Sequence, residues 1–177
     1  MNPWSFMAFL IVPMSVLGGG FQFPSAGSSE SPDGKWRVIC KSPTNDVNQA
    51  GHLLLLKRSH GGTLNIRRFD RSCDVLWSPD SSHFALSDWW ASDKADVFVC
   101  SVAKPQSSRS VTKNFPGYLI PADELRGHCY FEAHKWLNRH LLVIKVSGHT
   151  DEVPVRGFEH EYVFDCASGK FEKRVPK

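Results

Sequence analysis

The sequence carries little net charge and lacks any long tract of one sign. Its 21 Lys and Arg residues are nearly matched by 18 Asp and Glu residues, which leaves a formal net charge of +3 over 177 residues. Nucleic-acid binding calls for clustered basic residues, and here they are spread along the chain. With 41% hydrophobic residues, the chain is too apolar for a disordered protein. We therefore expect one folded domain with no nucleic-acid partner.

Charged residues are absent from the first 26 positions, where an apolar run occupies residues 4–17. That run is shorter than the roughly 20 residues of a transmembrane helix, and it matches the apolar core of a secretory signal. Small residues suited to cleavage follow at 18–20 and again at 25–27, although no Lys or Arg precedes the run. We expect residues 1–26 to be a signal peptide or N-terminal anchor, and the only membrane contact. Residues 27–177 are then a single secreted or periplasmic domain.

Closely spaced cysteines are also missing. The five cysteines lie at least 27 positions apart, at Cys40, Cys73, Cys100, Cys129 and Cys166. This spacing excludes zinc knuckles and C-x-x-C redox motifs. In an exported protein they are disulfide candidates with one left over. The other interpretation is that several are small buried hydrophobes on strands, and the sequence leaves both open.

Helical patterns are almost absent, and short runs rich in branched and aromatic residues take their place. The expected strands are residues 35–41, 52–58, 63–69, 73–77, 83–88, 95–102, 129–137, 140–147, 162–166 and 170–175. Residues 103–114 are expected to form a loop, and residues 121–126 the one short helix. Many short, closely spaced strands predict an all-β, antiparallel fold.

A turn sequence recurs along the chain. SPDG at residues 31–34 returns as SPDSS at residues 78–82, at an offset of 47 positions, and each is followed by a strand. A fainter third copy at residues 135–143 has a Leu-Asn-Arg turn, with Trp136 in the place of Trp77. Proline sets φ at the second turn position and aspartate caps the turn. A period of roughly 40–50 residues containing such a turn is typical of propeller blades.

Residues 75–86, VLWSPDSSHFAL, resemble the TolB-like, Pro-Asp-repeat β-propeller family, and residues 31–36 do so less completely. In that family the segment links the outer strand of one blade to the inner strand of the next. The resemblance implies blade-like antiparallel sheets and no particular function, since such propellers serve many roles. About 150 residues after the signal allow three blades, too few to close a ring. An open or partial propeller, a collapsed β-sandwich, or a ring completed by another copy in a homo-oligomer remain.

Two adjacent tryptophans give the best candidate binding site. Asp88, Trp89 and Trp90 are expected in a loop between two strands, where neighbouring side chains point to opposite faces. At least one of the two indoles is then exposed or packed over a sheet edge. An exposed indole beside a carboxylate suits stacking against a sugar or a partner's side chain. A tryptophan that merely covers the sheet edge is the alternative.

Scattered histidines give weaker candidates. Glu132 and His134 are expected to share one face of a strand with Tyr130 and Trp136, while His140 opens the next strand. Glu132, His134 and His140 together suit a metal or an acid–base pair, or simply a solvated strand face.

A second histidine cluster follows later in the chain. It is the EHE run at residues 159–161, preceded by His149 and Asp151. Carboxylates that flank a histidine suit a cation, but a charged hairpin end has the same appearance.

Signatures of catalysis are absent: the sequence has no G-x-S-x-G, P-loop, dinucleotide-binding or H-E-x-x-H motif. The leading hypothesis is an exported, non-enzymatic β-domain that binds a protein or a glycan through Asp88, Trp89 and Trp90. It assigns no catalytic residue, metal or cofactor. The alternative is a small metal-dependent hydrolase that uses Glu132, His134 and His140.

Overall fold

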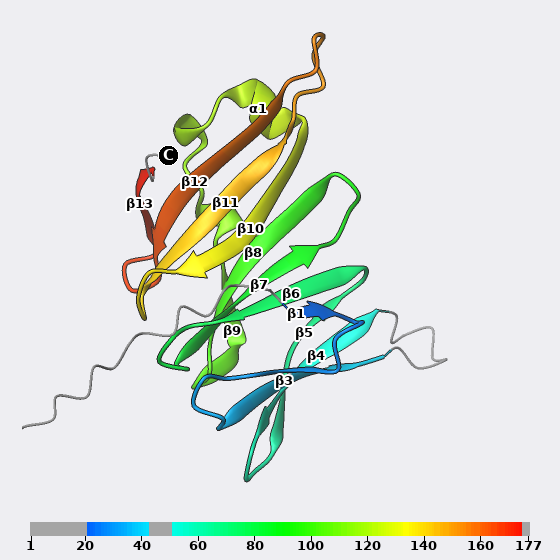
Figure 1. Cartoon of the computed structure of the whole chain (residues 1–177), viewed down its shortest axis with the longest axis vertical. Helices are drawn as coiled ribbons and strands as arrows, with labels where there is room; N and C mark the ends of the chain where they lie inside the picture. The colour runs from blue at the N-terminus through cyan, green and yellow to red at the C-terminus, as the bar shows by residue number, and fades with distance from the viewer. Residues whose placement is uncertain (1–20, 43–50, 175–177) are drawn as a thin grey trace, which may run out of the picture.

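The computed structural model describes residues 21–42 and 51–174, in which the strands form three consecutive four-stranded antiparallel units. Blade 1 contains β2 (Ser28–Glu30), β3 (Trp36–Lys41), β4 (His52–Arg58) and β5 (Thr63–Phe69). Blade 2 contains β6 (Ser72–Trp77), β7 (His83–Trp89), β8 (Lys94–Ser101) and β9 (Lys104–Ser110). Blade 3 contains β10 (His128–Trp136), β11 (Leu141–His149), β12 (Gly157–Asp165) and β13 (Lys170–Arg174). Figure 1 shows blade 1 at one end of the long axis and blade 3 at the other.

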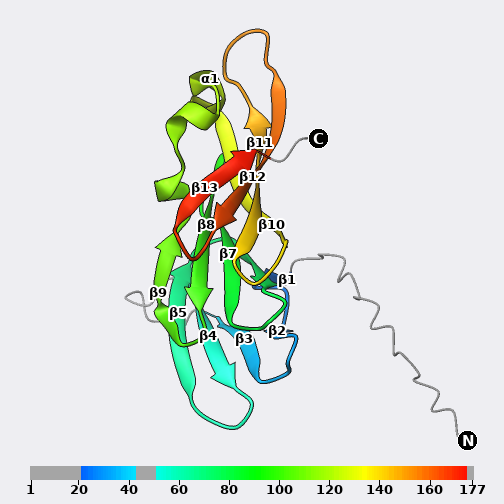
Figure 2. The same ribbon diagram turned by 90° about the vertical axis from the view of Figure 1, so that its left-hand side faces the viewer.

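The three blades belong to two sheets. Blade 1 is a sheet of its own, whereas blades 2 and 3 are joined where β10 runs parallel to the start of β8. A short strand, β1 (Phe21–Phe23), pairs with the free edge of β6. The described strands do not close into a ring, and Figure 2 shows them spread along the long axis. The predicted all-β fold of antiparallel, blade-like sheets is confirmed in its open form.

The recurring Ser-Pro-Asp turns have the same hydrogen bonds in blades 1 and 2. In blade 1 the Ser31 hydroxyl donates to Asp33 Oδ1 at 2.7 Å and accepts, at 3.0 Å, the N–H that opens β3. In blade 2 the Ser78 hydroxyl donates to Asp80 Oδ1 at 2.8 Å and accepts, at 3.0 Å, the N–H that opens β7. The corresponding partners lie 47 positions apart, so the sequence repeat is also a structural repeat.

Each of these turns joins two strands of one blade. The Ser31 turn connects β2 to β3, and the Ser78 turn connects β6 to β7, in antiparallel hairpins. The expectation that the segment links the outer strand of one blade to the inner strand of the next is therefore wrong. A turn this short joins hydrogen-bonded neighbours about 5 Å apart, whereas the crossing from outer to inner strand spans a whole blade.

Two hydrophobic cores lie between the blades. The first fills the junction of blades 1 and 2, where Leu54 of β4 and Phe84 of β7 are fully buried. The second fills the junction of blades 2 and 3, where Val97 of β8 and Leu142 of β11 are fully buried. Blade 2 is thus apolar on both faces, which explains the near-continuous hydrophobic runs of its central strands.

A tryptophan bonds each later blade to the one before it. Trp77 ends β6 and donates its indole N–H to Ser29 Oγ of blade 1 at 3.1 Å. Trp136 ends β10 and donates its indole N–H to the Leu76 carbonyl of blade 2 at 3.2 Å. The two acceptors are again 47 positions apart, so the expected equivalence of Trp77 and Trp136 holds.

A β-bulge between Ala133 and Lys135 changes which face the later residues of β10 present. Because of this bulge, the side chain of Trp136 packs, partly buried, against the core between blades 2 and 3. The expectation that Trp136 shares a face with Tyr130 and Glu132 is therefore wrong, because one extra residue reverses the alternation of a strand.

One expected loop proves to be a strand. Residues 104–110 form β9, whose sequence KPQSSRS is polar and contains a proline. Lysine, proline and a lack of apolar residues are typical of sheet edges, so the strand resembles a loop in sequence. The insertion before blade 3 follows it as η2 (Thr112–Asn114), η3 (Gly117–Leu119) and α1 (Ala122–Arg126). Helix α1 confirms the one short helix that was expected.

Strand β1 lies within the segment expected to be a signal peptide or anchor. Residues 1–20 of that segment are outside the described residues, whereas Phe23 is fully buried between blades 1 and 2. Strand β1 is therefore part of the fold, although it lies within the segment expected to be a signal peptide or anchor. Across residues 21–42 and 51–174, no helix has the length and apolarity needed to cross a membrane.

All five cysteines are free thiols in this structure. Cys73 and Cys100 are buried between blades 1 and 2, and Cys129 is buried between blades 2 and 3. Burial raises the pKa of Cys100 to about 12 and that of Cys129 to about 11. These three thiols behave as the small buried hydrophobes of the second interpretation, and the disulfide expectation is not supported.

Candidate functional site

A groove runs between the first strands of blades 2 and 3. Its lining combines residues of three strands with one residue of β1 and three loop residues: Ser72, Asp74 and Leu76 of β6, Ser87 and Trp89 of β7, Tyr130, Glu132, Ala133 and His134 of β10, Gln22 of β1, and Arg71, Ala91 and Ser92. We call it the β6–β10 groove. It contains a Trp89 hollow of about 330 Å³ and an Asp74 hollow of about 280 Å³. Gln22 lines both hollows, so the two are neighbours.

Strand periodicity explains why these residues meet. Ser72 is opposite Trp89 and Asp74 is opposite Ser87 across the β6–β7 hairpin, so alternate residues of both strands share one face. The Ser87 hydroxyl accepts the Ala133 N–H at 3.0 Å and so holds β10 against β7. From residue 72 to residue 76 the groove is about 14 Å long, since an antiparallel strand rises about 3.4 Å per residue.

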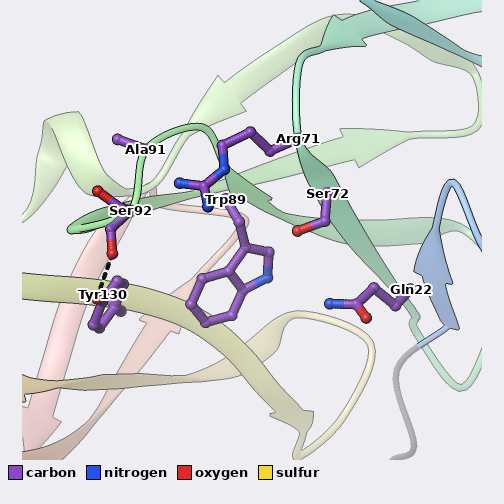
Figure 3. A pocket seen from close by; sticks show the side chains of 7 residues that line it. All are labelled: Gln22, Arg71, Ser72, Trp89, Ala91, Ser92 and Tyr130. Atoms are coloured by element: carbon purple, nitrogen blue, oxygen red, sulfur yellow. Dashed lines mark hydrogen bonds between the residues drawn. The ribbon is translucent and has the colours of Figure 1, made fainter.

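Trp89 and Tyr130 form the aromatic wall of the Trp89 hollow. Their ring centroids are 5.6 Å apart and the rings are tilted by 43°. The indole N–H donates to Asp74 Oδ2 at 2.7 Å, and the Tyr130 hydroxyl donates to the Ser92 carbonyl at 2.7 Å. Figure 3 shows the indole in the middle of the hollow, with Tyr130 and Ser92 on one side and Gln22 on the other. Because the polar end of each ring is bonded, the ring faces are held in fixed positions.

The two hollows carry opposite charge. Arg71, exposed just before β6, lines the Trp89 hollow. The Asp74 hollow is lined by two carboxyl groups, Asp74 of β6 and Glu132 of β10, and by His134. His134 is 3.5 Å from the carboxylate of Glu161 on β12. The groove therefore runs from a positive end to a negative end.

Asp74 is a half-buried carboxyl group with a raised pKa. Burial raises the pKa of Asp74 above its usual value, the Trp89 hydrogen bond opposes that rise, and the Glu132 charge adds to it. Within residues 21–42 and 51–174, no Lys, Arg or His forms an ion pair with Asp74. Glu132 differs, because Lys145 Nζ lies 3.8 Å from its carboxylate.

The three residues predicted to bind a partner are separated in the structure. Trp89, which ends β7, lines the groove. Trp90 is 49% exposed and lies outside the lining of both hollows, so the two indoles diverge as expected. Asp88 is only 3% exposed and pairs with Arg67 of blade 1 at 2.9 Å. Asp88 thus joins blades 1 and 2.

Sequence reasoning missed Asp74, Tyr130 and Gln22 as groove residues. The alternation of Ser72, Asp74 and Leu76 along β6 is visible in the sequence, but nothing in the sequence pairs it with β10. Gln22 lies within the segment assigned to the signal peptide or anchor, so it was not considered for the folded domain.

Glu132, His134 and His140 do not form one site. Glu132 and His134 line the Asp74 hollow, whereas His140 lines a separate hollow with Pro79 and Asp80 beside the turns. In the part of the chain that the structure describes, no group of three or more His, Cys, Asp or Glu side chains is placed to hold a metal ion. The structure therefore separates His140 from Glu132 and His134.

The second histidine cluster holds structural elements together. His160 Nε2 is 2.6 Å from Glu124 Oε2, which fastens α1 to β12. Glu159 lies 3.6 Å from Lys145 and His149 stacks on His128 at 4.1 Å, so these side chains point in different directions. The charged hairpin end is the interpretation that fits.

Comparison with known proteins gives a fold but no family. No family model and no curated protein matches the chain. The apo structure of AtxE2 isopeptidase is similar over 85% of this chain and 29% of that chain, with a TM-score of 0.57 and 14% identity. A chain in the complex of Tne2 with Tni2 is similar over 85% of this chain and 96% of that chain, with a TM-score of 0.48 and 14% identity. A TolB structure from Agrobacterium tumefaciens is similar over 85% of this chain and 45% of that chain, with a TM-score of 0.37 and 21% identity.

This chain thus spans less than a third of the isopeptidase. At such identities the likeness concerns the fold alone. It supports a β-propeller-like arrangement of the blades.

Proposed function

We propose that the protein is an exported, non-enzymatic binding module that holds an extended segment of a partner protein in the β6–β10 groove. The observation that carries this proposal is a pair of neighbouring hollows, one lined by two fixed aromatic rings and the other by hydrogen-bonding side chains. Fixed aromatic rings with polar groups around them are the usual chemistry of recognition sites.

The shape and charge of the groove favour a peptide segment over a glycan. A length of about 14 Å accommodates about four residues of an extended chain. Side chains of an extended peptide alternate, so neighbouring hollows take residues two positions apart. The separation of Arg71 from the carboxylates of Asp74 and Glu132 also suits a peptide, because peptide side chains carry charges of both signs.

A positional-scanning library of hexapeptides tests the proposal. We expect the wild-type protein to select particular residues at two positions, and Trp89→Ala to weaken binding at least about tenfold, as the loss of a central aromatic contact does. Trp90→Ala is the matched control, since it removes the adjacent indole, which is exposed and outside both hollows. Binding by this control should stay within about twofold of the wild type.

Gln22→Ala is a second test that does not depend on the folding of the Trp89 variant, because Gln22 is exposed and lines both hollows. We expect it to weaken peptide binding while leaving the thermal unfolding curve unchanged.

A glycan array is measured in parallel. Binding to glycans with no binding to peptides would show that the partner class is wrong. Equal loss in the Trp89 and Trp90 variants would show that the groove is not the site.

A further inference from the structure

We propose that the Asp74 hollow is the subsite for a Lys or Arg side chain of the bound segment, an inference that rests on the proposed function. The hollow has a volume of about 280 Å³ and is bounded by Gln22, Asp74, Ser87, Glu132 and His134. Its two carboxylates come from different blades, Asp74 from β6 and Glu132 from β10.

Among the described residues Asp74 forms no ion pair, whereas Glu132 shares Lys145 with Glu159. Asp74 and Glu132 each raise the energy of the other when both are ionised, and burial of Asp74 adds to that cost. A cation placed between them removes the repulsion and supplies the missing partner of Asp74. The side chains of Lys and Arg end in the groups that donate hydrogen bonds to carboxylates.

The basic residues around the hollow have carboxylate partners outside it, so they need not compete with a cation of the ligand. Lys145 is 3.8 Å from Glu132 and also 3.6 Å from Glu159, so Lys145 keeps a carboxylate partner when Glu132 turns to a ligand. His134 is 3.5 Å from Glu161 on β12, which likewise offers it a partner outside the hollow.

The indole N–H of Trp89 donates to Asp74 Oδ2 at 2.7 Å, so Trp89 fixes the position of the carboxylate that would receive the cation. Arg71 at the opposite end of the groove repels a cation and so favours its placement in the Asp74 hollow.

The library of hexapeptides tests this inference with variants that change charge and little else. Asp74→Asn keeps an oxygen that accepts the Trp89 N–H, and Glu132→Gln keeps the shape of the side chain. We expect the wild type to select Lys or Arg at one position, and each variant to lose at least about tenfold of that preference, as for a charge-assisted hydrogen bond. Glu159→Gln is the matched control, because Glu159 also approaches Lys145 but does not line the hollow, and we expect it to retain the preference.

A change in the peptide alone provides the second test. The best Lys-containing hexapeptide and its Nε-acetyl-lysine counterpart are compared on the wild-type protein, so that no variant has to fold. We expect acetylation to weaken binding by about tenfold or more. Equal affinity of the two peptides, or unchanged preference in both groove variants, would overturn the subsite while the proposed function stands. If the wild type binds no peptide, the proposed function itself is wrong.

Discussion

The hydroxyl of Ser78 should be essential to the stability of blade 2. Ser78 is fully buried, and its hydroxyl donates to Asp80 at 2.8 Å while accepting the N–H of His83 at 3.0 Å. Ser78→Ala leaves the His83 N–H without this acceptor at a site that has little access to water. An unsatisfied buried donor costs about 1–3 kcal/mol. Asp80 itself is exposed, so water can replace the Ser78 hydroxyl as its hydrogen-bond donor. The lost Ser78–Asp80 bond therefore adds little to the destabilisation.

Urea-induced and thermal unfolding, both followed by tryptophan fluorescence, measure this loss of stability. We expect the free energy of unfolding to fall by about 1–3 kcal/mol and the Tm to fall by about 2–12 °C, given the usual scaling for a chain of this size. Ser31→Ala, which removes the same two bonds from blade 1, should give a similar loss. Ser107→Ala on the exposed face of β9 is the control and should stay within about 0.5 kcal/mol. If Ser78→Ala also stays within that range, the turn does not hold the blade as we infer.

Three further predictions follow from the packing and charges. Because its pKa is raised in the fold, Asp74 lowers stability as pH rises through that raised value, so Asp74→Asn should gain stability over the wild type between pH 4 and neutral pH. The gain should vanish in acid, where both folded and unfolded states are protonated, and urea titrations across pH measure it. Asp88→Ala should lower the free energy of unfolding by about 3–5 kcal/mol in calorimetry, because it leaves Arg67 partly buried without its partner. Cys100 is fully buried, and burial raises its pKa to about 12, so this thiol should react with a disulfide reagent at pH 8 only after unfolding.

The repeating units were predictable from the sequence because the turn of each unit is encoded by a few consecutive residues. Ser78 and Asp80 recur 47 positions after Ser31 and Asp33, and a turn depends on residues that are neighbours in the chain. The match of Trp136 to Trp77 was visible for the same reason. What the repeat did not show was its place in the blade, because the same pattern fits a turn within a blade or between blades.

The groove was beyond prediction because it depends on contacts between distant segments. Trp89 was chosen from its neighbour Trp90, yet its partners Asp74 and Tyr130 lie 15 and 41 positions away in the sequence. A bulge of one residue in β10 and a three-residue strand, β1, complete the walls. The burial of Asp88 against Arg67 could not be predicted, because a carboxylate beside an indole has the same appearance in sequence whether it faces solvent or a partly buried arginine.

A titration of the ¹⁵N-labelled protein with the hexapeptide that the library ranks highest would test the central claim most directly. We predict saturable shifts in the amide signals of residues 72–76, 87–92 and 130–134, three separate segments that include most of the lining of the β6–β10 groove. The signals of residues 137–140 beside the other hollow should stay unchanged. Shifts confined to that second hollow or to blade 1, with none along β6 and β10, would contradict the assignment of the groove as the binding site.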